Sequence, residues 1–110
     1  MIRETISEIE ARIKNAQSLN DAKKEELLKL LSTLRTEVSE LSKTHAEQTQ
    51  SIAGFTGVSV HEAMREEKNP QLLKLSLQGL STSVEGFESS HPKLVEIVNS
   101  ICLTLSNIGI

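Results

Sequence analysis

Apolar residues recur at alternating spacings of four and three along nearly the whole chain, and this pattern constrains the fold class most. The spacing places side chains on one face of an α-helix, whereas a half-buried β-strand requires a spacing of two. We call each such row a seam, and four are present: Ile2, Ile6, Ile9, Ile13 and Ala16; Leu27, Leu31, Leu34, Val38, Leu41, His45, Gln48, Ile52 and Phe55; Leu73, Leu77, Leu80, Val84 and Phe87; and Leu94, Val98, Ile101, Leu105 and Ile108. The pattern predicts an all-α protein of coiled-coil-like or bundled helices.

The first two seams predict an antiparallel helical hairpin over residues 1–53. Leu19-Asn20-Asp21 interrupts the pattern. Asn20 or Asp21 can cap the next helix, because a short polar side chain accepts a hydrogen bond from an unpaired backbone N–H. The second seam then continues without a gap, so we expect one helix over residues 22–53. This helix would be about twice as long as the first and would overhang it.

Residues 54–68 read as a connector between two hairpins. Gly54 and Gly57 indicate a helix stop, and Ser59 with Glu62 fits a capping box that would begin a short helix over residues 60–68. Asn69-Pro70 is a further start signal, with Asn as the cap and Pro at the first helical position. We therefore expect a second hairpin over residues 69–110, forming one folding unit with the first.

Charge divides the chain unevenly between the two predicted hairpins. Residues 1–53 hold 17 charged side chains, whereas residues 69–110 hold five. Two helices with so few charges are poorly suited to solvation over their whole outer surface. We expect the second hairpin to be enclosed by the first or by another copy of the chain. Its predicted core is Val84, Phe87, Leu94, Val98, Ile101 and Leu105.

Composition argues against several classes of function. The chain has no Trp, no Tyr and two Phe, so it lacks the rings that stack bases or sugars. Its net charge of −3 gives no electrostatic footprint for nucleic acid. The charged N-terminus lacks a signal-peptide pattern, no window is apolar enough to cross a membrane, and Cys102 has no second cysteine to pair with. These features predict a cytoplasmic protein that binds neither nucleic acid nor membrane.

Three stretches carry a resemblance to a known family: residues 62–70 (EAMREEKNP), 86–94 (GFESSHPKL) and 105–110 (LSNIGI). They resemble a family of small bacterial helical proteins catalogued only as a domain of unknown function. The Phe-Glu-x-Ser-His-Pro element and the Gly-Ile ending are the most specific parts, and the match is best over residues 60–110. The resemblance implies a small, bacterial, all-helical protein and brings no activity or cofactor with it.

Polar residues on the helices offer two candidate sites. His45 and Gln48 occupy seam positions of the long helix, where buried polar residues set the register of a helix pair; the alternative is that the helix is solvated there. A charged group on the short helix is either a solvated surface with ion pairs or a patch for a protein partner. This possible partner patch is His61, Glu62, Arg65 and Glu66.

No residue pattern supports catalysis. Glu88-x-x-His91 has the spacing used in di-iron bundles, but such sites need two of these motifs and two more carboxylates. We interpret His91 as a loop residue and Cys102 as a small core residue, since no basic cluster surrounds the thiol. No catalytic, cofactor or metal site is assigned.

The sequence favours a non-enzymatic helical interaction or assembly module that self-associates as a homodimer. The overhang of the long helix would supply the interface: Leu41, His45, Gln48, Ile52 and Phe55. An unknown protein partner is an alternative. Two other classes stay open, namely a membrane-surface helical protein and a small metal- or ligand-binding bundle. The latter would use His45, His61 or His91 with Glu62, Glu66 or Glu88.

Overall fold

The computed structural model describes residues 2–109, and this part of the chain forms five α-helices and no strand. Met1 and Ile110, and the side chains of Ile2 and Arg3, lie outside this description. The predicted all-α class is confirmed, with about three quarters of the chain helical. The helices are α1 (Ile2–Lys14), α2 (Asp21–Leu41), α3 (Ala46–Ala63), α4 (Pro70–Ser83) and α5 (Pro92–Gly109).

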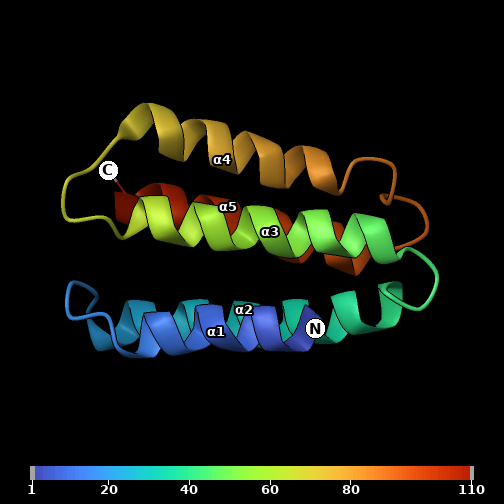
Figure 1. Ribbon diagram of the computed structural model, residues 1–110, viewed down its shortest axis with the longest axis horizontal. Coiled ribbons are helices and arrows are strands. Elements are labelled where there is room, and N and C mark those ends of the chain that lie inside the picture. Colours follow the sequence, from blue (N-terminus) through green and yellow to red (C-terminus); the bar gives the residue numbers. More distant parts are fainter. Residues whose placement is uncertain (1, 110) are drawn as a thin grey trace.

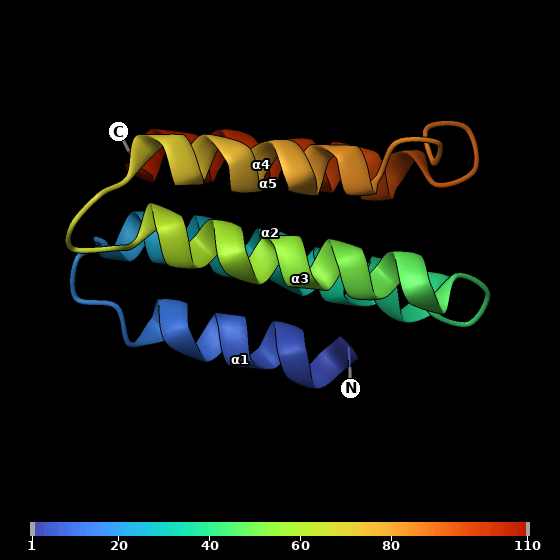
Figure 2. The same ribbon diagram turned by 45° about the horizontal axis from the view of Figure 1, so that its top comes forward.

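Successive helices run antiparallel and are joined by short loops at the two ends of an elongated bundle (Figure 1). The packing order around the bundle is α1, α2, α5, α4 and α3, and α3 also contacts α5 across the middle. Helices α2 and α3, although consecutive, touch only slightly. Figure 2 shows α1 at one edge of the bundle and α4 beside α5 at the opposite edge. Helix α3 therefore contacts both the N-terminal helix α1 and the C-terminal helices α4 and α5.

Two of the predicted helix starts are confirmed by their caps. The Asn20 side chain accepts a hydrogen bond from the backbone N–H of Lys23 at 2.8 Å, which satisfies one of the unpaired donors at the start of α2. The Asn69 side chain accepts one from Leu72 N–H at 3.1 Å, and Pro70 is the first residue of α4. Between α4 and α5 the chain turns at Gly86, whose φ of +95° favours glycine.

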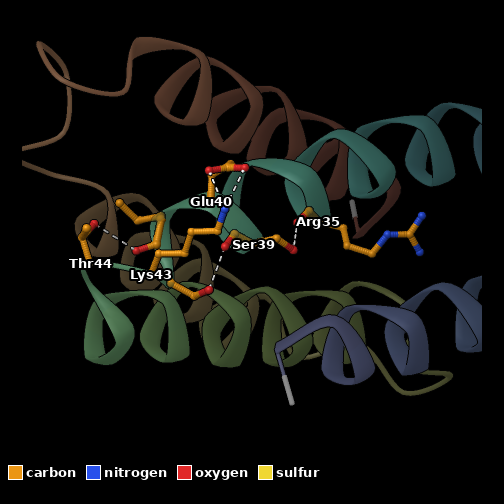
Figure 3. Close-up of polar contacts among 7 residues, drawn as sticks. Arg35, Ser39, Glu40, Lys43 and Thr44 are labelled. Atoms are coloured by element: carbon orange, nitrogen blue, oxygen red, sulfur yellow. Dashed lines mark hydrogen bonds and ion pairs between the residues drawn. The ribbon is translucent and has the colours of Figure 1, made fainter.

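The predicted single helix over residues 22–53 is wrong, because the chain reverses at residues 42–45. Side-chain hydroxyls compete for backbone carbonyls there. Ser42 Oγ donates to the Ser39 carbonyl at 2.8 Å and Thr44 Oγ1 donates to the Leu41 carbonyl at 3.4 Å. Figure 3 shows this polar end of α2, including the Lys43–Glu40 ion pair at 3.3 Å. The break ends α2 at Leu41 and removes the overhang on which the dimer interface was based.

The predicted connector over residues 54–68 is also wrong in its first part. Helix α3 continues through Gly54 and Gly57 to Ala63, so Ser59 is a buried helical residue and not a cap. Gly57 faces α1, where a Cβ would make an ordinary contact with Ile9 Cδ1 at 3.6 Å, so packing does not exclude a side chain there. The short helix predicted over residues 60–68 is replaced by the end of α3 and a loop that leads to α4.

The hydrophobic core runs through the whole bundle and is built from the seams. The predicted core of the C-terminal hairpin is confirmed, because Val84, Phe87, Leu94, Val98, Ile101 and Leu105 are all buried. The other seams contribute in the same way, among them Ile6, Ile13, Leu27, Leu31, Leu34 and Leu80. Gly109 belongs to α5 and packs against the Leu73 side chain.

Candidate interaction surface

The five residues predicted to form a dimer seam are not on one surface. Leu41 and Ile52 are buried in the chain's own core at 1% and 0% exposure. His45 is half-buried in the loop between α2 and α3. Gln48 and Phe55 are exposed on α3. The structure therefore keeps only Gln48 and Phe55 as residues that a second molecule could contact freely.

A different group of exposed apolar side chains lies across α3 and α4. We call this the α3–α4 face and define it by Phe55, Val58, Leu72 and Leu75, which are between 40% and 55% exposed. The Phe55 ring covers Gly79 of α4, where even a methyl group would collide with it. Because α3 and α4 run antiparallel, Val58, one turn after Phe55, lies level with Leu75, one turn before Gly79. The four side chains thus form one surface and are not scattered.

Helices α3 and α4 themselves contribute few charges to this face. Over its exposed surface α3 offers Glu47 and His61 near its two ends, and α4 offers only Lys74. The intervening exposed positions are glutamine, serine, threonine or glycine. At its α1 edge, Gly54 and Val58 line a hollow together with Glu8 and Arg12 of α1. Large apolar side chains exposed side by side are typical of interaction surfaces, whereas single exposed ones are common on any protein.

Gly54 lies in the same exposed stripe, next to Phe55 and one turn before Val58. A Cβ at this position would meet no described atom within 4 Å, and the backbone is helical. Glycine inside a helix destabilises it by about 0.5–1 kcal/mol relative to alanine. Nothing inside the described chain requires this glycine.

The possible partner patch is largely an internal ion-pair cluster. Glu62 is buried at 8% exposure, and its carboxylate accepts a hydrogen bond from Arg65 Nη1 at 2.9 Å. His61 Nε2 lies 3.9 Å from the other carboxylate oxygen. His61 and Glu66 are exposed beside this pair. The Glu62 carboxylate thus has its partners within the chain. This favours the ion-pair interpretation of the four residues over a patch for a protein partner.

Two of the three histidines meet at one end of the bundle. The rings of His45 and His91 each pack edge-on against Phe87, with centroid distances of 5.4 Å and 5.5 Å, and lie 6.3 Å from each other. Each Nδ1 has a hydroxyl neighbour, Thr44 Oγ1 at 2.7 Å and Ser90 Oγ at 2.9 Å. These contacts close the end of the core, a role that the sequence pattern did not reveal.

The Glu88-x-x-His91 spacing, to which no metal site was assigned, belongs to a turn in the structure. The Glu88 carboxylate accepts the backbone N–H of Gly86 at 2.9 Å within the turn. Within residues 2–109, no three His, Cys, Asp or Glu side chains are grouped closely enough to hold a metal ion. His61 lies on α3, away from the other two histidines, which occupy loops at the opposite end of that helix.

Cys102 is half-buried between α5 and α4, with its Sγ 3.9 Å from the Leu77 carbonyl oxygen. Desolvation by burial raises the pKa of this thiol above its usual value. A raised pKa lowers the fraction of reactive thiolate at neutral pH. The geometry supports the prediction of a packing residue and not a nucleophile.

A family model described as Domain of unknown function (DUF4404) matches residues 27–110. The chain belongs to this family. The resemblance is confirmed, and the match extends further toward the N-terminus than the motifs of residues 60–110 indicated. No curated protein and no solved structure matches the chain significantly.

The DUF4404 match covers most of α2 and all of α3, α4 and α5, and it leaves α1 outside. The whole α3–α4 face therefore lies within the family region. Helix α1 packs on α2 and α3 at the edge of the bundle, as an addition to a four-helix unit. In the part of the chain that the structure describes, no helix is both long and apolar enough to cross a membrane.

Proposed function

We propose that this DUF4404 protein is a non-enzymatic helical interaction module that self-associates through the α3–α4 face. The observation that carries this proposal is the group of large exposed apolar side chains, Phe55, Val58, Leu72 and Leu75, on two neighbouring helices that themselves carry little charge. Covering such side chains removes apolar surface from water, which is the main favourable contribution to association.

A second copy of the chain is the occupant that fits this face best. The centre of the face is apolar and matches itself, and at its α1 edge Glu8 and Arg12 offer charges of both signs, which two copies related by a two-fold axis can complement. A two-fold axis through the face would place α3 and α4 of one protomer against α3 and α4 of the other. Gly54 would then allow the two α3 backbones to approach closely, which accounts for a glycine that the single chain does not need.

The size of the face sets the expected affinity. Association costs about 4–15 kcal/mol before any contact is counted. Each of the four side chains is already about half covered, so each gains only part of the ~1.5–3 kcal/mol of full burial. A dimer that forms in the micromolar range or above is the expected result.

Sedimentation or light scattering over a range of protein concentrations tests the proposal. The unmodified chain should approach twice its 12.1 kDa mass as concentration rises. Leu75→Glu should hold the protein as a monomer, because a carboxylate would be buried without a partner in the dimer. Leu103→Glu is the matched control, since Leu103 is 65% exposed on α5, outside the face. A constant monomer mass for the unmodified chain at high concentration would overturn the proposal.

The cellular setting is proposed on separate grounds. Cys102 is a free thiol, which fits a reducing compartment. The resemblance to small bacterial helical proteins supports a bacterial source. We therefore place the module in a bacterial cytoplasm.

A further inference from the structure

We propose that the groove between α4 and α5 binds a free single-chain anionic amphiphile, with fatty acids as the simplest case. This groove has a volume of about 750 Å³. Clefts of roughly 300–1,000 Å³ that are mostly apolar, with a few polar groups, are typical of small-molecule sites. The inference is independent of the proposed self-association, because it concerns a different side of α4.

The groove has an apolar floor and a polar rim. Leu73 and Leu77 of α4 and Gly109 of α5 form its apolar wall, with Pro70 at one end. The rim and the two ends carry Lys68, Lys74, Gln78, Ser81 and Ser106. The α4 positions from Pro70 to Ser81 span about 16 Å of helix. The site is therefore long and narrow, a shape that suits an extended hydrocarbon chain better than a compact ring system.

Gly109 shapes one end of this groove. A methyl group at this position would collide with a terminal carbon of Leu73, and the α-carbon of Ala63 would lie 3.5 Å from it. With no side chain at Gly109, Leu73 can lie against α5 instead of filling the space above the floor. The absence of a side chain thus helps to keep the groove open at its lysine end.

The positive charges that line the groove favour a ligand with an anionic head group. The only charged side chains that line the groove within the described residues are Lys68 and Lys74, which flank the start of α4. The Lys68 ammonium donates to the carbonyl of Ala63, the last residue of α3, which holds it at the mouth of the groove. An ammonium has three donors, so Lys68 can still offer two to a ligand. A carboxylate at this end, with its chain running toward Ser81, satisfies both the charge and the shape.

Binding can be measured directly because the chain contains no tryptophan. A Gln78→Trp variant places one fluorophore on the rim of the groove, and dodecanoate is added below the concentration at which it forms micelles. We expect saturable binding of one dodecanoate per chain. Dodecanol should bind more weakly by roughly tenfold, because it lacks the charge that the two lysines recognise. No saturable response to dodecanoate, or equal affinity for dodecanol, would overturn the proposal.

Variants of the groove locate the site by calorimetry on chains without the reporter. Lys68→Met with Lys74→Met should weaken dodecanoate binding by roughly tenfold, whereas Lys29→Met on α2 should leave it unchanged. Ser106→Trp should abolish binding by filling the groove. If circular dichroism shows that Ser106→Trp does not fold, Ser81→Trp blocks the other end. Binding that survives in a folded blocking variant places the ligand elsewhere and overturns the proposal.

Two further measurements distinguish this groove from the self-association face and from a membrane-binding surface. Leu75→Glu, which should prevent self-association, should bind dodecanoate as well as the unmodified chain does. Loss of binding in that variant would contradict an independent site on α4 and α5. Vesicles that contain phosphatidylglycerol should not carry the protein upward in a flotation gradient. Flotation with the vesicles would replace the free ligand by a membrane surface and would overturn the proposal.

Discussion

The two edges of the bundle expose different kinds of side chain to water. On the α1–α2 side the outer surface carries charged residues that pair with one another, as in Arg35–Glu10 at 2.8 Å and Lys23–Glu26 at 3.4 Å. On the α3, α4 and α5 side the structure exposes large apolar side chains: Phe55, Val58, Leu72, Leu75 and Leu103. Both sides bury apolar seams, but among the described residues the buried polar ones all lie in α3, α4 and α5: Thr49, Thr56, Ser59, Glu62, Ser76 and Thr104.

This contrast teaches that the core and the surface of a small bundle carry separate information. The seams fill most of the interior, whereas α3 contributes mainly small or polar residues such as Thr49, Ala53 and Thr56. Exposed ion pairs such as Lys23–Glu26 add little stability, about 0–1 kcal/mol. Their main consequence is that the α1–α2 edge remains hydrated and unattractive to other chains. The sparsely charged side lacks that protection, and this is where the proposed interactions lie.

The largest expected effect tests the core that both sides share. Phe87→Ala should lower the free energy of unfolding by about 3–5 kcal/mol, because it empties a buried site and removes the edge-on contacts with His45 and His91. His91→Ala, which leaves Phe87 in place, should have a smaller effect. Thermal or urea unfolding followed by circular dichroism measures both. An unchanged melting curve for Phe87→Ala would show that this end of the core is not packed as described.

A smaller effect of opposite sign is expected at Gly54 on the apolar side. Gly54→Ala should stabilise the single chain by about 0.5–1 kcal/mol, because the helix gains a better helix former and no described atom is displaced. Gly54→Gln should weaken self-association, because its side chain would separate the two α3 backbones. Unfolding at low protein concentration and sedimentation at high concentration measure the two effects. Unaltered association in Gly54→Gln would remove the glycine from the proposed interface.

The charged side should respond only slightly. Arg35→Gln removes the ion pair with Glu10, whose side chain is 13% exposed, and should lower the free energy of unfolding by about 0.2–1 kcal/mol. The difference from the unmodified chain should shrink in high salt, because ions screen such pairs. Lys43→Gln is the control, since Lys43 and Glu40 are about 70% exposed and their pair should be worth less still. Urea unfolding at low and high salt distinguishes the two variants.

The smallest effect is on a reaction rate and involves no change in stability. Cys102 should react with iodoacetamide at neutral pH more slowly than an exposed thiol, since burial raises its pKa and restricts access. Its rate should keep increasing at pH values where an ordinary thiol has already levelled off. Ser51→Cys in a Cys102→Ser background provides the exposed reference on α3. Equal rates at neutral pH would show that the contact between α4 and α5 is open.

Much of the fold could be predicted because helix periodicity and caps are local. The seams identified the core, and Asn20 and Asn69-Pro70 located two helix starts. The break at residues 42–45 could not be found from spacing, because this loop has the length that preserves the 4-3 pattern from Leu41 to Ile52. Gly54 and Gly57 suggested a helix end because glycine has a low helix propensity. The structure keeps both in α3, and no local pattern reports the packing of this helix against its neighbours.

The candidate surface was predicted less well. Phe55 was predicted to be an interface residue because it continues a seam. Two other members of that seam, Leu41 and Ile52, are buried in the core. Val58, Leu72 and Leu75 were missed. Their position outside the seams was not a sufficient signal, because Val60 and Leu19 also lie outside the seams and are buried. Which of them lie side by side depends on how α3 packs against α4, and this becomes known only with the structure.

The packing order of the helices also has a kinetic consequence. The hairpins α1–α2, α3–α4 and α4–α5 join neighbours in the chain and can form locally, whereas α5 must reach α2 across two intervening helices. Once α3 and α4 have paired, fewer freely moving residues separate α2 from α5. Bringing these two helices together then costs less loop-closure entropy. Few contacts then need a long search, and helical bundles of this kind fold in microseconds to milliseconds. The contact between α2 and α5 should form last, and weakening it should mainly accelerate unfolding.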